Sequence, residues 1–157
     1  MSKQTLHIVK IGGNVINDDI ALNSFLKDFS ELEGPKILVH GGGKKATEVS
    51  LAMGLKPKMI NGRRVTDKAT VEVVTMVYAG LLNKKITAIL QKNGCNAMGL
   101  SGADANCILA HKRIVKDLDY GFAGDIDAVN HSIINVLLQH DVTPVFCAIT
   151  HDKNGQL

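Results

Sequence analysis

The chain is poor in residues that several classes of protein depend on. It has no tryptophan, and aromatic residues make up only 4% of it, which argues against the stacking platforms used to bind nucleic acid. Its three cysteines, Cys95, Cys107 and Cys147, are far apart and form no C-x-x-C motif, so we expect buried, reduced thiols. The six histidines show no metal-binding spacing. We therefore expect no nucleic-acid partner and no metal held by the protein.

Long hydrophobic runs are also missing. No apolar run approaches the roughly 18–20 residues that span a bilayer, and the first expected strand follows Met1-Ser2-Lys3-Gln4 directly, which leaves no room for a secretion signal. At 157 residues, 45% hydrophobic and 21% charged, the chain has the composition of one ordinary globular domain. We therefore expect a cytoplasmic protein without a membrane partner.

Short apolar runs alternate with amphipathic segments. The runs at 6–9, 36–39, 95–100 and 142–149 predict strands, and the segments from Asp18, at 44–53 and at 129–140 predict helices. Asp18 or Asp19 lies near the start of the first helix, and its expected buried side holds Ile20, Leu22, Phe25, Leu26 and Phe29. This alternation favours an α/β fold with a mainly parallel open sheet.

A hairpin is predicted at 58–65, because Asn61-Gly62 between apolar residues suits a type I′ turn. It is either an arm that contacts substrate or a plain connection. Arg63 and Arg64 alternate along its second strand, so only one of them can point into a site. Residues 108–115 and the region around Tyr120-Gly121-Phe122 predict a second small hairpin.

Thr66 or Asp67 is expected to cap a long helix that ends near Asn93-Gly94. Apolar residues follow its 3.6-residue period, namely Val71, Val74, Tyr78, Leu81, Leu82, Ile86, Ile89 and Leu90. About 25 residues at 1.5 Å each give a length near 40 Å, and Ala79-Gly80 would let another helix approach closely. Two interpretations stay open: the helix covers its own sheet, or it also crosses a second copy in a dimer.

Two glycine turns follow the first two expected strands. Lys10-Ile11-Gly12-Gly13-Asn14 and His40-Gly41-Gly42-Gly43-Lys44 each precede an amphipathic segment, and such turns bind anions through exposed backbone N–H groups. A Walker motif fails at Leu38 and Lys45, and the dinucleotide motif G-x-G-x-x-G is also absent. What remains is an anion site built from two loops, or two structural turns. Ser101-Gly102-Ala103-Asp104 forms a third polar turn at a strand end.

Five segments together resemble the amino acid kinase family, and within it the acetylglutamate kinases. They are KIGGN (10–14), VHGGGK (39–44), NGRRVT (61–66), GLSGAD (99–104) and YGFAGDI (120–126). The glycine motifs are shared across that family, whereas the hairpin followed by the long helix is more specific. The resemblance implies a three-layer αβα sandwich and transfer of the γ-phosphoryl of ATP, with Mg²⁺ carried on the nucleotide, to the side-chain carboxylate of N-acetyl-L-glutamate in arginine biosynthesis.

The resemblance also implies roles for particular residues. Lys10 would be the catalytic lysine on the phosphate oxygens, with Gly12, Gly13 and Gly43 as phosphate-binding donors. Gly42 and Gly43 would line the acceptor site, and Arg64 would clamp the α-carboxylate of the substrate, a bidentate contact that lysine cannot reproduce. The helix at 67–93 would form a homodimer.

The family pattern continues beyond what these 157 residues contain, through an Asn-rich segment into a half that binds ATP. We therefore expect residues 1–157 to be the N-terminal domain that binds N-acetylglutamate and dimerises, the C-terminal ATP-binding domain to be absent from this chain, and the isolated chain to be inactive. Two alternatives stay open: another member of the family, with N-succinylglutamate or another acid or phosphate as acceptor, and a non-catalytic module that binds an acylated amino acid.

Overall fold

The computed structural model describes residues 5–157, so the expectation that Met1–Gln4 leave no room for a secretion signal lies outside the described residues. Four strands form one sheet in the order β1-β2-β8-β5, and every neighbouring pair is parallel. They are β1 (His7–Ile11), β2 (Lys36–His40), β5 (Ala97–Leu100) and β8 (Thr143–Cys147). The predicted parallel sheet is confirmed, and all four strands end at one edge.

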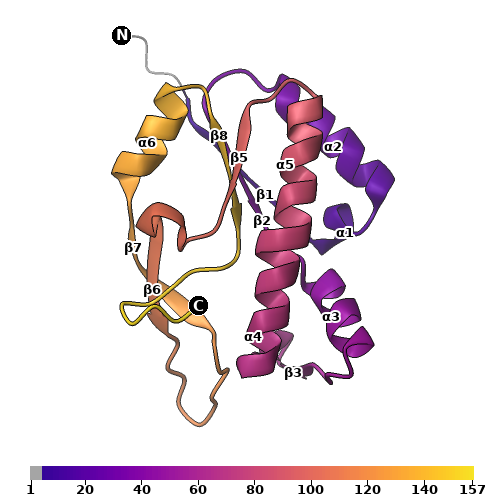
Figure 1. The fold of residues 1–157 in the computed structure, drawn as a ribbon, viewed down its shortest axis with the longest axis vertical. Helices are drawn as coiled ribbons and strands as arrows, with labels where there is room; N and C mark the ends of the chain where they lie inside the picture. Colours follow the sequence, from indigo (N-terminus) through magenta and orange to yellow (C-terminus); the bar gives the residue numbers. More distant parts are fainter. Residues whose placement is uncertain (1–4) are drawn as a thin grey trace.

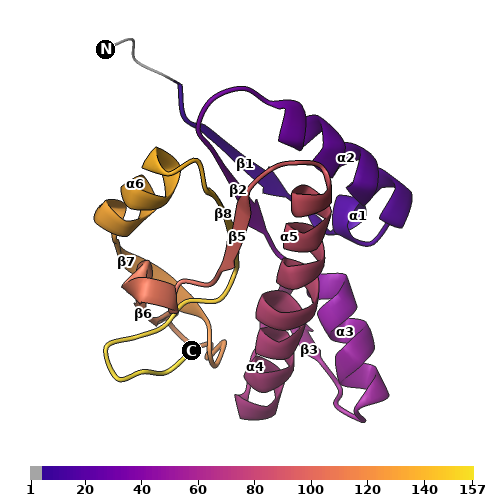
Figure 2. The ribbon, with the colours of Figure 1, turned by 45° about the horizontal axis from the view of Figure 1, so that its top comes forward.

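Helices cover both faces of this sheet (Figures 1 and 2). One face carries the long helix with α2 (Asp19–Glu31), and α1 (Gly13–Ile16) and α3 (Gly43–Ala52) flank them. The other face carries α6 (His131–Gln139), whose Ile133, Ile134 and Leu138 pack on Ile37 and Phe146. The predicted three-layer αβα arrangement is confirmed.

The long helix runs continuously from Lys68 to Lys92. Asp67 caps its start, where its carboxylate accepts a 2.8 Å hydrogen bond from the Thr70 N–H. It comprises α4 (Lys68–Thr75), the π-helical segment η1 (Met76–Leu82) and α5 (Asn83–Lys92). By length and composition alone it could cross a membrane, but core helices of globular proteins share this property. Its residues Val73, Ile86 and Leu90 are buried in the core.

Two antiparallel hairpins project beyond the carboxyl edge of the sheet (Figure 1). The first pairs β3 (Lys58–Ile60) with β4 (Arg63–Val65), and Asn61 and Gly62 take φ values of 49° and 75° at its turn. The second pairs β6 (Ile108–Lys112) with β7 (Gly124–Val129), after the short 3₁₀ segment η2 (Asp104–Asn106). The first predicted hairpin is confirmed. The second is present, but placing its second strand around Tyr120-Gly121-Phe122 is wrong, because that segment hydrogen-bonds to Thr66 and the strand follows it at Gly124–Val129.

The expected burial of Ile20 is wrong, because its side chain is 85% exposed. The buried face of α2 consists of Leu22, Leu26 and Phe29, spaced at the helical repeat. Ile20 lies two residues before Leu22, which puts it on the opposite side of the helix at about 100° per residue. Of the two candidate cap residues, Asp18 is the cap, and it accepts bonds from the N–H groups of Ile20 and Ala21.

Candidate active site

The two glycine loops leave neighbouring strands at the same level. Ile11 pairs with His40 in the β1–β2 register, so the loops that begin at Gly12 and Gly41 lie next to each other. Gly12 is the N-cap of α1 and Gly42 is the N-cap of α3, and neither helix has a side-chain cap. The N–H groups at the start of the ten-residue helix α3 are therefore open to an anion.

Gly42 is packed directly against the long helix. A Cβ built on Gly42 would lie 2.3 Å from Leu82 Cδ1 and 3.0 Å from the ring of Tyr78, so the end of the Leu82 side chain would have to move and the ring contact would be tight. The glycine therefore allows the loop backbone to pack closely on the π-helical segment η1.

Arg64 joins the first hairpin to the second glycine loop. Its Nη2 donates to the Gly43 carbonyl at 2.9 Å and to Thr47 Oγ1 at 2.7 Å. Its Nη1 is buried and finds no acceptor among residues 5–157. Arg63, by contrast, is exposed, so Arg64 is the inward member of the pair. A buried guanidinium nitrogen without an acceptor is costly. Nη1 has almost no exposed surface, so a carboxylate in the cavity that Arg64 lines would accept from it only after the guanidinium rotates.

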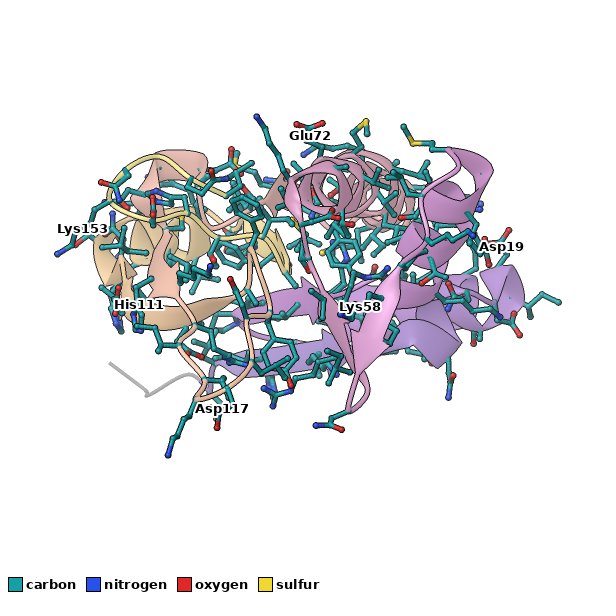
Figure 3. All side chains as sticks on the ribbon, turned by 90° about the horizontal axis from the view of Figure 1, so that it is seen from below. Asp19, Lys58, Glu72, His111, Asp117 and Lys153 are labelled. Atoms are coloured by element: carbon teal, nitrogen blue, oxygen red, sulfur yellow. The ribbon has the colours of Figure 1, made fainter. Side chains whose placement is uncertain are left out.

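A cavity of about 910 Å³ lies beyond Arg64, between the long helix, the carboxyl edge of the sheet and the β6–β7 hairpin. Its walls include Tyr78, Phe122, His111 and His151. Figure 3 looks onto this edge, with the hairpin that carries Lys58 next to the hairpin that carries His111 and Asp117. The volume is in the range of small-molecule sites.

The predicted site residues do not all line this cavity. Arg64 does, whereas Lys10 and the loop glycines lie beside it. Lys10 is exposed near the end of β1, paired in register with Val39, and Val39 lines the cavity. The structure therefore brings Gly43 and Arg64 into direct contact, sets Gly12 and Gly13 beside that loop, and leaves Lys10 exposed on the neighbouring strand.

The sequence did not predict that Thr66, Gly121 and Phe122 form one wall of the cavity. The Thr66 N–H donates to the Tyr120 carbonyl at 2.9 Å, and the Phe122 N–H donates to the Thr66 carbonyl at 2.7 Å. A Cβ on Gly121 would lie 2.0 Å from the Thr66 carbonyl oxygen. A glycine between two aromatic residues was the available signal for this close backbone contact.

Tyr78 was expected to be an ordinary core residue of the long helix, and it also lines the cavity. Burial raises the pKa of Tyr78, while the positive charge of Arg64 partly offsets that rise. The phenol is therefore neutral near pH 7, when it can serve as a hydrogen-bond donor. The π-helical segment, which a 3.6-residue period does not reveal, sets its direction.

Side-chain pairs link the two strands of the β6–β7 hairpin and its loop. Lys112 Nζ lies 2.9 Å from Asp119 Oδ2, His111 Nδ1 lies 2.6 Å from Asp127 Oδ1, and Arg113 pairs with Asp125. Bonds to Arg113 lower the pKa of Asp125, and those to Lys112 lower the pKa of Asp119. These carboxylates are ionised and engaged at neutral pH.

The described residues at this edge include no activated cysteine and no cluster of metal-binding side chains. All three cysteines are free and buried, and burial raises the pKa of Cys147, on the cavity wall, to about 11. Its thiol is therefore protonated at neutral pH and a poor nucleophile. Within residues 5–157, no group of three His, Cys, Asp or Glu side chains is arranged to hold a metal ion.

A parallel α/β sheet carries its ligand site at the carboxyl edge of the strands, and here that edge presents an open helix N-terminus, of the kind that suits an anion, and a half-buried arginine. The particular family follows from comparison with known proteins. The family model described as "Amino acid kinase family" matches residues 5–157, and the chain belongs to this family.

Curated relatives carry the name acetylglutamate kinase. That of Cytophaga hutchinsonii is 54% identical over 155 residues, which cover 98% of this chain and 59% of the relative. That of Phocaeicola vulgatus is 50% identical over 155 residues, covering 99% of this chain and 60% of the relative. The chain therefore spans about three fifths of the length of these relatives.

Solved structures confirm the fold at low sequence identity. N-acetylglutamate synthase of Neisseria gonorrhoeae, in complex with coenzyme A and N-acetyl-glutamate, superposes with a TM-score of 0.79 at 22% identity, over 97% of this chain and 35% of that chain. The protein smu.665 of Streptococcus mutans superposes with a TM-score of 0.77 at 23% identity, over 96% of this chain and 61% of that chain.

Proposed function

We propose that residues 1–157 form the acceptor-binding domain of a kinase that transfers the γ-phosphoryl of ATP to the side-chain carboxylate of N-acetyl-L-glutamate. The product is N-acetyl-L-glutamyl 5-phosphate, an intermediate of arginine biosynthesis. The names and identities of the relatives support this reaction. The nucleotide would bring its own Mg²⁺ and would bind largely outside this chain, so the isolated chain is expected to bind the acceptor without turnover.

The chemistry suits a site without a general base. A glutamate carboxylate, with an ordinary pKa of about 4.3, is already ionised at neutral pH. The obstacle is repulsion between this carboxylate and the polyphosphate, so catalysis consists of positioning and of positive charge or N–H donors around the transferred group. In this proposal Lys10 acts on the phosphate oxygens, Gly12 and Gly13 face the donor, and Gly42 and Gly43 face the acceptor.

The half-paired guanidinium of Arg64 is the observation that carries the proposal. Nη2 is held by Gly43 and Thr47, while the buried Nη1 has no acceptor among residues 5–157. Arg64 lines the cavity, and a rotation of its guanidinium would turn the buried Nη1 toward the α-carboxylate of an acyl-glutamate bound there. Because Arg64 also contacts Gly43, this hydrogen bond would place the substrate next to the second glycine loop, whose N–H groups would face the reacting carboxylate.

Two adjacent arginines provide the test. Arg64→Ala is expected to lower the affinity for N-acetyl-L-glutamate at least tenfold, since a charge-assisted hydrogen bond of about 1.5–3 kcal/mol is lost. Arg63→Ala, at an exposed neighbour, is the matched control and should leave the affinity within twofold. Isothermal titration calorimetry on the 157-residue chain measures both.

Binding titrations and one turnover assay decide between the remaining functions. Affinity for an inorganic or organic phosphate in place of the acyl-glutamate, with no effect of Arg64→Ala, would favour another member of the family. Tighter binding of N-succinyl-L-glutamate would favour that acceptor. A non-catalytic binding module is favoured if a longer form of the protein binds N-acetyl-L-glutamate but releases no ADP from ATP.

We also propose a homodimer through the long helix and a cytoplasmic location. Three free, buried thiols suit a reducing compartment. The outward face of the helix carries Met76, Gly80 and Leu81, of which Met76 is 53% and Leu81 is 50% exposed. Nothing lies within 4 Å of a Cβ built on Gly80, so a second helix has room to approach.

A further inference from the structure

A buried polar pair lies directly behind the second glycine loop. His40 ends β2 and Asn83 begins α5, and each is only 1% exposed. His40 Nε2 lies 3.1 Å from Asn83 Nδ2, and His40 Nδ1 lies 2.9 Å from the Gly41 carbonyl oxygen. Two polar side chains buried in an otherwise apolar core are expensive unless each bond is satisfied.

The surrounding groups fix the proton positions in this pair. Asn83 Nδ2 lies 2.9 Å from the Val145 carbonyl, which can only accept. Asn83 Oδ1 lies 3.2 Å from the Lys84 ammonium, which can only donate. The amide nitrogen therefore faces His40 as a donor, so Nε2 must accept, and the single proton of the neutral imidazole is on Nδ1.

The Nδ1 proton in turn fixes a peptide group of the loop. It is donated to the Gly41 carbonyl, which belongs to the peptide between Gly41 and Gly42. A trans peptide is planar, with its C=O and N–H pointing in opposite directions, and the described chain has no cis peptide bonds. The Gly42 N–H therefore points away from His40, and it has no acceptor among residues 5–157.

The π-helical segment that precedes Asn83 brings its side chain within hydrogen-bond distance of His40. Bonds from i to i+5 widen the helical turn, so Tyr78 and Asn83 face the same region. Tyr78 and Leu82 pack on Gly42, while Asn83 reaches His40. Gly99 on β5 makes room on the far side, because a Cβ there would lie 2.0 Å from Asn83 Oδ1.

We infer that His40, held by Asn83, is a positioning residue that fixes the Gly41–Gly42 peptide and so aims the Gly42 N–H at an anion bound at the glycine loop. The identity of that anion as the acceptor carboxylate rests on the proposed function. The direction of the N–H does not, because it follows from the hydrogen bonds of the chain itself.

Two variants separate the two ends of the imidazole. His40→Asn keeps an amide donor near the position of Nδ1 and loses the Nε2 acceptor. His40→Gln keeps an acceptor near the position of Nε2 and loses the donor to Gly41. Both remove the ring from the core, so both are expected to lower the midpoint of thermal unfolding, and each serves as the stability control for the other.

The first readout needs no ligand. Long-range ¹H–¹⁵N spectra of the wild-type chain should give the neutral Nδ1–H tautomer of His40, and residual dipolar couplings report the direction of the Gly42 amide. That direction should persist in His40→Asn and change in His40→Gln. An Nε2–H tautomer in the wild type, or an unchanged Gly42 amide in His40→Gln, would overturn the inference.

The second readout is binding of N-acetyl-L-glutamate. Its affinity should fall about tenfold in His40→Gln, as expected for the loss of one aligned hydrogen bond to a charged group, and less than threefold in His40→Asn. Equal losses of affinity in the two variants would show that His40 acts only through packing in the core and does not position the loop peptide. If the wild-type chain does not bind N-acetyl-L-glutamate, the proposed function fails, while the couplings still decide the role of His40.

Discussion

Single atoms decide how the glycine loop meets the long helix. Gly42 leaves no space for a methyl group, because Leu82 Cδ1 and the Tyr78 ring occupy it, whereas nothing lies within 4 Å of a Cβ on its neighbour Gly41. The two adjacent glycines therefore differ in how well the fold tolerates an alanine in their place. The sequence motif alone does not distinguish them.

Gly42→Ala is therefore expected to destabilise the chain by about 1–3 kcal/mol, the usual cost of forcing extra volume into a packed region. Urea denaturation measures this free energy of unfolding. Gly41→Ala is the matched control, expected to change it by less than about 0.5 kcal/mol. Equal stability of the two variants would show that the loop does not pack on the helix as described.

At the scale of elements, the base of the β3–β4 hairpin is joined to the loop before β7. The two hydrogen bonds of Thr66, to Tyr120 and Phe122, form a single parallel bridge between Thr66 and Gly121. This bridge closes one side of the cavity. Gly121 takes a φ of 70° and its missing Cβ faces the Thr66 carbonyl, so both its backbone conformation and its contact require glycine.

Gly121→Ala should be more harmful than Gly62→Ala, although the two glycines have similar positive φ values of 70° and 75°. Gly62 is in an open turn with nothing within 4 Å of a Cβ, so its replacement carries mainly the backbone cost, about 1 kcal/mol. Gly121→Ala adds a clash with Thr66 and should cost at least about 2 kcal/mol. Thermal unfolding compares them, and a smaller effect at Gly121 would contradict the bridge.

The order of elements was accessible from the sequence because each depends on local signals. Alternating apolar runs predicted the strands, Asn61-Gly62 predicted the hairpin, and Asp67 predicted the start of the long helix. The π-helical segment was not accessible, since it adds one residue to a turn without changing the composition. The directions of the Tyr78 and Asn83 side chains depend on this segment, so their contacts with the second glycine loop could not be predicted from the sequence.

Nor did the motifs reveal how the site residues are connected. The alternation of Arg63 and Arg64 showed that one must face inward, but not which one. The hydrogen bonds of Arg64 to Gly43 and Thr47 depend on the hairpin folding back over α3, a long-range contact that no local pattern encodes. The contact of Gly121 with Thr66 is long-range in the same way.

At the scale of the whole molecule, the outward face of the long helix is the proposed dimer contact. Glu72 on this helix points away from the sheet (Figure 3), and the exposed Met76 and Leu81 follow farther along it. Leu81→Glu should shift the chain to monomer, because a buried unpaired charge at a helix crossing is strongly unfavourable. Sedimentation equilibrium measures the shift.

Ile114→Glu is the control for this prediction, because Ile114 is 89% exposed and belongs to the β6–β7 hairpin region rather than to the helix. It should leave the association state unchanged. A wild-type chain that sediments as a monomer at all concentrations would contradict the dimer contact, and so would a dimer that tolerates Leu81→Glu.

The central claim is that the carboxyl edge of this sheet binds the acceptor of a phosphoryl transfer. Titration of the ¹⁵N-labelled 157-residue chain with N-acetyl-L-glutamate, followed by ¹H–¹⁵N NMR, tests it most directly. The account predicts saturable shifts of the Gly42 and Gly43 amides and of the Arg64 side chain. Shifts confined to other parts of the chain, or no saturable shift at millimolar ligand, would contradict it.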